Sequence, residues 1–253
     1  MRTWVVIAVG AVALSCRSGA PVPEARADVS PQGVAVVELF TSEGCSSCPP
    51  ADDVLATLAR STDARVYPLA YHVDYWDGLG WPDRFASPHN TARQQGYAHA
   101  LGVRGLYTPQ VVVGGTEEFV GSDRDRAKAA VARALAVPAT VRISLRARWT
   151  APDAVTVDYQ ALGAALRSDV TIAVVEPAAS TAVRRGENAG KVLSHANVVL
   201  GFVSLPLESD GSATVRLAAA ARGDLEVMAL VQKRDAGVGM PIAGAARAPL
   251  TAR

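Results

Sequence analysis

Val34-Ala-Val-Val-Glu-Leu-Phe-Thr-Ser-Glu-Gly-Cys45-Ser-Ser-Cys48-Pro-Pro is a stretch in which an apolar run ends at a Cys-x-x-Cys pair. The run from Val34 to Phe40 is rich in β-branched and aromatic residues, which favour a buried strand. From Ala51 to Arg60, apolar side chains recur at helical spacing. We therefore expect Cys45 and Cys48 to lie where a strand is followed by the first turn of a helix.

This position has chemical consequences for the two cysteines. Unpaired backbone N–H groups and the positive end of the helix dipole stabilise a thiolate, which is the species that attacks a disulfide. We therefore interpret the pair as the site of a thiol-disulfide oxidoreductase, with Cys45 as the more exposed nucleophile and Cys48 as the resolving thiol. Glu38, seven residues before Cys45, is the candidate proton acceptor, because burial raises the pKa of a carboxyl group. It could equally occupy an exposed position of the strand.

Two other functions fit the same residues. Cys45, Cys48 and His72 are ligand types that copper or zinc accepts, which makes a metal-binding module the first alternative. The second alternative is a binding protein in which Cys45 and Cys48 form a structural disulfide. Such a disulfide closes so small a loop that its entropic benefit is slight. The oxidoreductase interpretation requires no cofactor.

Four separated motifs support the redox interpretation. They are Glu38-Leu-Phe-Thr-Ser-Glu-Gly-Cys-Ser-Ser-Cys-Pro, His72-Val-Asp-Tyr-Trp-Asp-Gly-Leu-Gly-Trp, Tyr107-Thr-Pro-Gln and Gly186-Glu-Asn-Ala-Gly-Lys. In this order they resemble domain of unknown function 1223, a family of secreted bacterial thioredoxin-like proteins. The resemblance implies a thioredoxin-like fold and a redox motif, but no established substrate. It also implies a catalytic position for Pro109, with the preceding peptide bond cis and close to the Cys-x-x-Cys pair.

The same motifs supply candidate substrate-binding residues. A long aromatic loop follows the second predicted strand, at an edge where open α/β sheets bind ligands. Its tryptophans could equally cap the core. The later glycine-rich segment could face the redox site, or it could simply fix two domains together through hydrogen bonds. The candidates are His72, Asp74, Trp76, Thr108, Glu187, Asn188 and His195.

The pattern of apolar and polar residues changes at Pro138. Before it, strand and helix patterns alternate, with a β-α-β unit at the start. From Thr140 onward, apolar and polar residues alternate in short runs separated by turn signals, as expected of antiparallel strands. The predicted fold is an α/β thioredoxin-like domain at residues 34–137, followed by an all-β, sandwich-like C-terminal domain at residues 138–253.

The N-terminus has the architecture of an export signal. A basic residue precedes an apolar segment from Trp4 to Leu14, which is too short to cross a bilayer stably, and Cys16 follows at once. We predict a lipoprotein-type signal at residues 1–16, lipidation of Cys16, and a flexible tether at residues 17–33. The alternative is ordinary cleavage after Ala27. Lipidation of Cys16 would leave the Cys-x-x-Cys pair without a stray thiol, in keeping with an oxidising compartment.

The charge and composition of the chain limit the classes of partner that we expect. The chain has 253 residues, with 25 basic and 24 acidic side chains, so its net charge of +1 gives no reason to expect a nucleic-acid surface. The expected partners are protein thiols or disulfides. A membrane is the other expected partner, through the lipid anchor, which places the protein in the periplasm or cell envelope.

Overall fold

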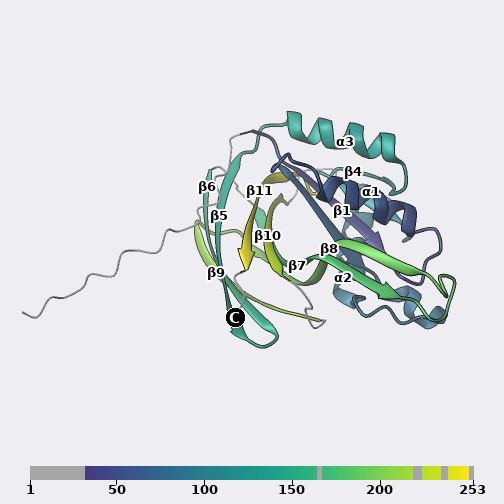
Figure 1. Cartoon of the computed structure of the whole chain (residues 1–253). Coiled ribbons are helices and arrows are strands. Elements are labelled where there is room, and N and C mark those ends of the chain that lie inside the picture. The colour runs from purple at the N-terminus through teal and green to yellow at the C-terminus, as the bar shows by residue number, and fades with distance from the viewer. Residues whose placement is uncertain (1–31, 164–166, 219–223, 235–238, 251–253) are drawn as a thin grey trace, which may run out of the picture.

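The computed structural model describes residues 32–163, 167–218, 224–234 and 239–250. The protein is mostly β, with 47% strand and 21% helix. One mixed sheet has eight strands in the order β11-β10-β7-β8-β2-β1-β3-β4, and a second sheet has the order β5-β6-β9 (Figure 1). The elements are β1 Ala35–Thr41, α1 Pro49–Ala59, β2 Val66–His72, the 3-10 helix η1 Asp74–Leu79, α2 Pro88–Leu101, β3 Gln110–Val113, β4 Glu117–Val120, α3 Arg124–Ala136, β5 Val141–Ala151, β6 Ala154–Gly163, β7 Ser168–Ala182, β8 Val192–Pro206, β9 Asp210–Arg216, β10 Leu225–Lys233 and β11 Ile242–Leu250.

The large sheet overturns the predicted fold class. Strands from both sides of residue 138 belong to it, because β8 pairs in parallel with β2 at Ala70 and Val198. The protein is therefore not a thioredoxin-like α/β domain followed by an all-β sandwich domain. The change in periodicity after Pro138 reports a local change of secondary structure, whereas strand pairing across the chain leaves no local signal. The domain boundary near residue 138 stays a prediction, because strands that share a sheet do not show whether the two parts of the chain fold independently.

The predicted β-α-β unit at the start is present. All seven residues of β1 are buried, and β1 pairs in parallel with β2 from Ala35 opposite Val66 to Thr41 opposite His72. Helix α1 lies between them in sequence and begins with two prolines. Proline is tolerated there because the first helical N–H groups have no partner within the helix. Cys48 is the N-cap residue, so the Cys-x-x-Cys turn lies at the helix start as expected.

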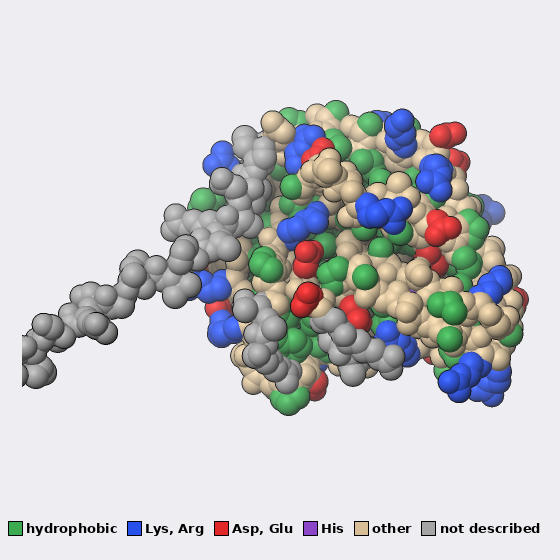
Figure 2. Space-filling model, in the orientation of Figure 1, with side chains coloured by type: hydrophobic (Ala, Val, Ile, Leu, Met, Phe, Trp, Pro, Cys, Tyr) green, Lys and Arg blue, Asp and Glu red, His purple; other side chains and the backbone are tan. Residues whose placement is uncertain are grey.

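Helices cover both faces of the sheet around β1. Val37 and Leu39 point toward α1 and α3, in a core cluster that includes Val54 and Ala130. Alternate residues of β1 point the other way, where Phe40 packs with Tyr97 of α2. Figure 2 shows acidic and basic side chains interspersed over the visible face, in keeping with the small net charge.

The other half of the large sheet packs against the three-stranded sheet. Their shared core includes Ile143 and Val157 from the small sheet and Ile172 and Val227 from the large one. Strands β7 and β8 form an antiparallel hairpin of 15 residues each, with one irregularity between Val174 and Val175. Figure 1 shows this hairpin extending from the three-stranded sheet to the end of the molecule where α2 lies. Its tip, residues 183–191, contacts the Cys-x-x-Cys turn.

Candidate active site at the Cys45–Cys48 disulfide

Cys45 and Cys48 form a disulfide at the N-terminus of α1, with their Cα atoms 5.4 Å apart. Both residues are 0% exposed, although Ser46 and Ser47 between them are exposed. The predicted greater exposure of Cys45 is therefore wrong for the oxidised protein. The turn reaches the surface through its serines, while the sulfurs lie beneath it.

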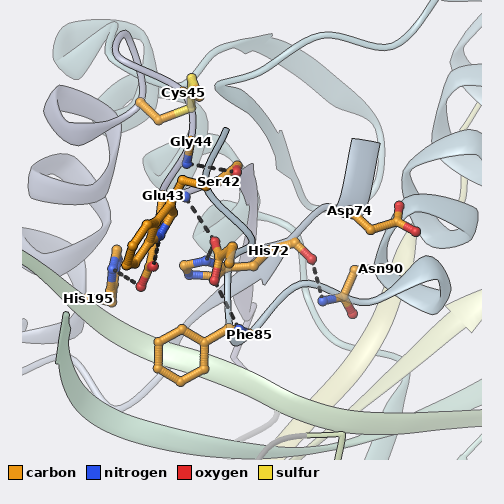
Figure 3. Close-up of polar contacts among 12 residues, drawn as sticks. Ser42, Glu43, Gly44, Cys45, His72, Asp74, Phe85, Asn90 and His195 are labelled. Carbon is orange, nitrogen blue, oxygen red and sulfur yellow. Dashed lines mark hydrogen bonds and ion pairs between the residues drawn. A yellow bond between two sulfur atoms is a disulfide. The ribbon is translucent and has the colours of Figure 1, made fainter. Parts of the chain in front are cut away.

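A buried group of charged side chains lies next to the disulfide (Figure 3). His72 Nδ1 lies 2.6 Å from Asp83 Oδ2, which also accepts a hydrogen bond from the Glu43 backbone N–H. The Glu43 carboxylate accepts a bond from Trp81 Nε1 at 2.7 Å and lies 3.4 Å from His195 Nε2. The two histidine rings meet edge to face, with centroids 4.8 Å apart. Strands β1, β2 and β8 and the loop after η1 thus converge here.

The pKa values within this group follow from burial and pairing. Burial opposes the charged form of His72, but the charge of Asp83 and its hydrogen bond outweigh this and raise the pKa of His72. Burial likewise opposes ionisation of Asp83, and His72 outweighs it, so the pKa of Asp83 is lowered. Burial also opposes ionisation of Glu43, but its contacts with His195 and Trp81 hold its pKa below the ordinary value. Each of these shifts favours the charged form, so the contact between His72 and Asp83 favours an ion pair, and Glu43 adds a negative charge.

Asp52 is the buried carboxyl group one helical turn after Cys48. Its backbone N–H donates to the Cys48 carbonyl oxygen at 3.1 Å, and the residue is 6% exposed. Burial raises the pKa of Asp52 to about 7, against an opposing effect of His195. A carboxyl group with this pKa can accept and return a proton near neutral pH.

Replacing Asp52 by asparagine is expected to flatten the pH dependence of stability. The Asp52 pKa is about 7 in the folded protein against an ordinary value of 3.8. The folded state therefore binds this proton more tightly, so the stabilisation is complete below pH 3.8 and is lost as the pH rises through about 7. At about 1.4 kcal/mol per pKa unit, the wild type should lose a few kcal/mol that the variant does not.

Urea unfolding of the oxidised protein across this pH range measures the effect. Asp53→Asn provides the matched control, because Asp53 is an exposed neighbour on the same helix. Parallel pH profiles for Asp52→Asn and the wild type would contradict the assignment of a raised pKa to Asp52.

The hairpin tip brings two predicted residues to the Cys-x-x-Cys turn. Asn188 is 0% exposed, and its Nδ2 donates to the carbonyl oxygens of Glu43 and Cys45, each at 2.9 Å. Glu187 accepts a hydrogen bond from the Ser46 backbone N–H at 3.0 Å. Lys191 Nζ donates to Asn188 Oδ1 and so fixes the orientation of the amide. The glycine-rich segment therefore contacts the Cys-x-x-Cys turn directly.

A second contact joins the turn to the Thr-Pro motif. Trp76 Nε1 donates to Thr108 Oγ1 at 2.8 Å, and a Cβ atom placed on Gly44 would lie 3.4 Å from Trp76 Cβ. The Thr108–Pro109 peptide bond is cis, which confirms the cis geometry expected at Pro109. Trp76 thus lies between the residue before Cys45 and the residue before Pro109.

Two predicted residues have other neighbours. Glu38 lies on the face of β1 that α2 covers, where it pairs with Arg93 and accepts a hydrogen bond from Tyr97. Its carboxylate is therefore engaged in the core. Asp74 accepts a hydrogen bond from Thr91 at the start of α2, and Figure 3 shows it well away from Cys45.

The remaining predictions for the site concern metal and lipid. Among the residues that the structure describes, no three His, Cys, Asp or Glu side chains are arranged to hold a metal ion. No described helix is long and apolar enough to span a membrane. Cys16, the signal at residues 1–16 and all but the last two residues of the tether lie outside the described ranges.

Sequence reasoning missed several residues of this site. Asp52 and Glu43 are acidic residues near the Cys-x-x-Cys pair, but their burial and their pairing could not be predicted from their positions in the sequence. Trp81 belongs to the predicted aromatic loop, but nothing in the sequence indicated its bond to Glu43. Asp83 carried no signal, because its partners His72 and Glu43 lie 11 and 40 residues away in sequence. Lys191 ends the fourth motif, but its bond to Asn188 was not among the predictions.

Comparisons with known proteins give a family and one solved structure. The sequence profile of the family described as "Protein of unknown function (DUF1223)" matches residues 36–232. A crystal structure of a protein from Agrobacterium tumefaciens, a structural-genomics target, is 34% identical to this chain. The similarity covers 85% of this chain and 94% of that one, with a TM-score of 0.60. No curated protein matches this chain.

Proposed function

The chain belongs to the family of proteins of unknown function DUF1223, and we propose that it is a thiol-disulfide oxidoreductase that acts on protein disulfides through Cys45 and Cys48. One observation carries this proposal. A disulfide at a helix N-terminus lies one turn from Asp52, a buried carboxyl group with a pKa of about 7. A disulfide with a purely structural role has no need of such a proton acceptor.

The reduced protein would act in two steps. First, the Cys45 thiolate attacks one sulfur of the substrate disulfide, which forms a mixed disulfide and releases one substrate thiolate. Second, Cys48 attacks the Cys45 sulfur, the mixed disulfide breaks, and the second substrate thiolate leaves. The Cys48 proton passes to Asp52, and the departing thiolates take up protons. Two electrons move from the cysteine pair to the substrate, and the opposite reaction oxidises a substrate dithiol.

The surrounding charges influence the balance between the two redox states. Glu43 and the Asp83–His72 pair together carry a net negative charge beside the sulfurs. This charge opposes the thiolate that the helix N-terminus favours. Because a reduced form that is less stabilised makes a weaker oxidant, we expect the protein to be a weaker oxidant than one with a cation at this place.

A direct test combines a redox measurement with a metal titration. The reduction potential is measured by equilibration with glutathione, and the reduced protein is then mixed with an oxidised, disulfide-containing protein. The proposal predicts reversible reduction and transfer of electrons to the protein disulfide. Tight anaerobic binding of copper or zinc through both sulfurs, without exchange, would favour the metal-module alternative with Cys45, Cys48 and His72. Absence of both activities would favour the structural-disulfide alternative.

We also propose that the protein is exported and held at a membrane by lipid on Cys16. A disulfide is in keeping with an oxidising compartment, and the apolar segment that ends at Cys16 fits a lipoprotein signal. Mass spectrometry of the exported protein should find a lipidated N-terminus at Cys16. An unmodified N-terminus at Asp28 would contradict the anchor and favour ordinary cleavage.

A further inference from the structure

The disulfide is hidden although the turn that carries it lies at the surface. Ser46 and Ser47 are exposed, whereas Cys45 and Cys48 are both 0% exposed. A reductant or a partner thiolate must reach a sulfur atom along the line of the S–S bond to react with it. As it stands, the oxidised protein therefore withholds its sulfurs from solvent.

Side chains of the hairpin tip, residues 183–191, bind backbone groups of the Cys-x-x-Cys turn. Asn188 donates to the carbonyl oxygens of Glu43 and Cys45, and Glu187 accepts from the Ser46 N–H. Gly186 of the tip packs against Trp81, since a Cβ atom on this glycine would lie 3.1 Å from Trp81 Cβ. Three hydrogen bonds thus join two adjacent tip residues to Glu43, Cys45 and Ser46 of the turn.

The tip can move without unfolding the sheets. Within the described residues 183–191, only Val183 and Asn188 are buried. Opening of the tip therefore exposes little apolar surface to water. It is turned by Gly186 and Gly190, whose φ angles are +76° and +82°, and glycine adopts these values without strain. Segments with few buried apolar contacts open locally at a lower free energy than the whole protein. Each hydrogen bond to the turn lowers the open population by about fivefold.

We propose that the tip is a removable cover, which keeps the Cys45–Cys48 disulfide unreactive until a polypeptide partner displaces Asn188 and Glu187. The partner class follows from the groups that are released. Opening frees one backbone N–H, at Ser46, and two backbone carbonyls, at Glu43 and Cys45, and an extended peptide pairs with such groups. The inference deepens the proposed function, on which its partner clause rests, because it states what must happen before exchange.

Reduction by dithiothreitol tests the cover without any partner. One reductant thiolate attacks a cysteine sulfur, the Cys45–Cys48 bond breaks, and a mixed disulfide forms. The second reductant thiolate then closes the cyclic disulfide of dithiothreitol. Both cysteines end as thiols that hold the two electrons and two protons lost by the reductant. Quenching with an alkylating agent at successive times gives the rate constant.

The oxidised full chain is compared with three variants. Glu187→Ala should be reduced about fivefold faster, and Asn188→Ala at least tenfold faster, since it loses two bonds. Arg185→Ala is the matched control, an exposed residue of the same tip, and should stay within twofold of the wild type. Equal rates for the wild type and the folded Glu187→Ala and Asn188→Ala variants would overturn the proposal.

A second readout covers the case in which Asn188→Ala fails to fold. Glu187 is exposed, so Glu187→Ala should fold, and hydrogen exchange at the Ser46 amide should be faster in this variant than in the wild type. Unchanged exchange together with unchanged reduction would overturn the cover. A reduced, unfolded protein at saturating concentration tests the partner clause. The partner has then displaced the cover in both proteins, so the gain from Glu187→Ala should shrink to within twofold. A gain as large as with dithiothreitol would remove the polypeptide from the proposal. Absence of any reaction with proteins would instead refute the proposed function and leave the cover intact.

Discussion

Replacing Cys45 by serine is expected to abolish exchange with protein disulfides. A serine hydroxyl does not ionise near neutral pH, so the variant lacks the thiolate that starts the reaction. The remaining Cys48 follows the turn at the N-cap position of α1, with Asp52 one turn behind it. In the proposed mechanism Cys48 attacks only the Cys45 sulfur, so it should not replace Cys45 as the nucleophile toward an outside substrate. The turnover of a disulfide-containing protein substrate, followed by thiol labelling, should therefore fall to the background rate.

Cys48→Ser should give a different result from Cys45→Ser. This variant keeps the Cys45 nucleophile but loses the thiol that resolves the mixed disulfide, so covalent complexes with partners should accumulate and disappear on reduction. Non-reducing electrophoresis and mass spectrometry would identify the partners. Ser46→Ala is the matched control, because it alters the same turn and keeps both sulfurs. Covalent complexes with Cys45→Ser instead would exchange the roles of the two cysteines.

Replacing Arg93 by methionine is expected to cost about 3–5 kcal/mol of folding free energy. The Arg93 and Glu38 side chains are 6% and 1% exposed, and Arg93 Nε lies 2.6 Å from Glu38 Oε1. Arg93 also donates to Gln232, whose Nε2 donates to Tyr97 Oη. Without Arg93, the Glu38 carboxylate would be left buried and uncompensated. A loss of this size is a large part of the 5–15 kcal/mol typical of a folded protein.

Urea unfolding of four proteins separates this effect from a general loss of packing. The double variant Glu38→Gln with Arg93→Met should recover part of the stability, since it removes the stranded charge. Arg148→Met is the matched control, because the Arg148–Asp158 pair is 54% and 43% exposed. Its loss should cost less than about 1 kcal/mol. A similar cost for Arg93→Met and Arg148→Met would contradict the role assigned to the buried pair.

The local elements could be predicted from the sequence because their signals are local. The β-branched run of β1, the helical spacing in α1 and the alternation of β5 to β7 each predicted the element that the structure contains. Helix α2 is different, since its buried residues are Asn90, Gln94 and Tyr97. A helix that is held by polar contacts lacks the apolar stripe that predicts orientation. The pairing of β8 with β2 could not be predicted from the sequence either, because it depends on which strand edges remain free for pairing.

The candidate site could be predicted in part. The motifs identified the disulfide, His72, Glu187, Asn188 and His195, which the structure brings together. The assignment of Glu38 as proton acceptor used its predicted burial and its distance in sequence from Cys45, but not the face of the strand on which it lies. Strand alternation turns Glu38 toward α2, on the opposite face from α1. Asp52 acquires its raised pKa from tertiary burial, for which helical spacing alone gives no measure.

The long β7–β8 hairpin limits how this protein can be recombined. One end of the hairpin belongs to the core shared with the three-stranded sheet. The other end carries Asn188 to the Cys45 carbonyl oxygen and His195 to the Glu43 carboxylate. A chimera that takes residues 138–253 from a relative would inherit that relative's residues around the sulfurs as well. The Cys-x-x-Cys turn and the β-rich part are therefore not interchangeable modules, and substitutions in one must remain compatible with the other.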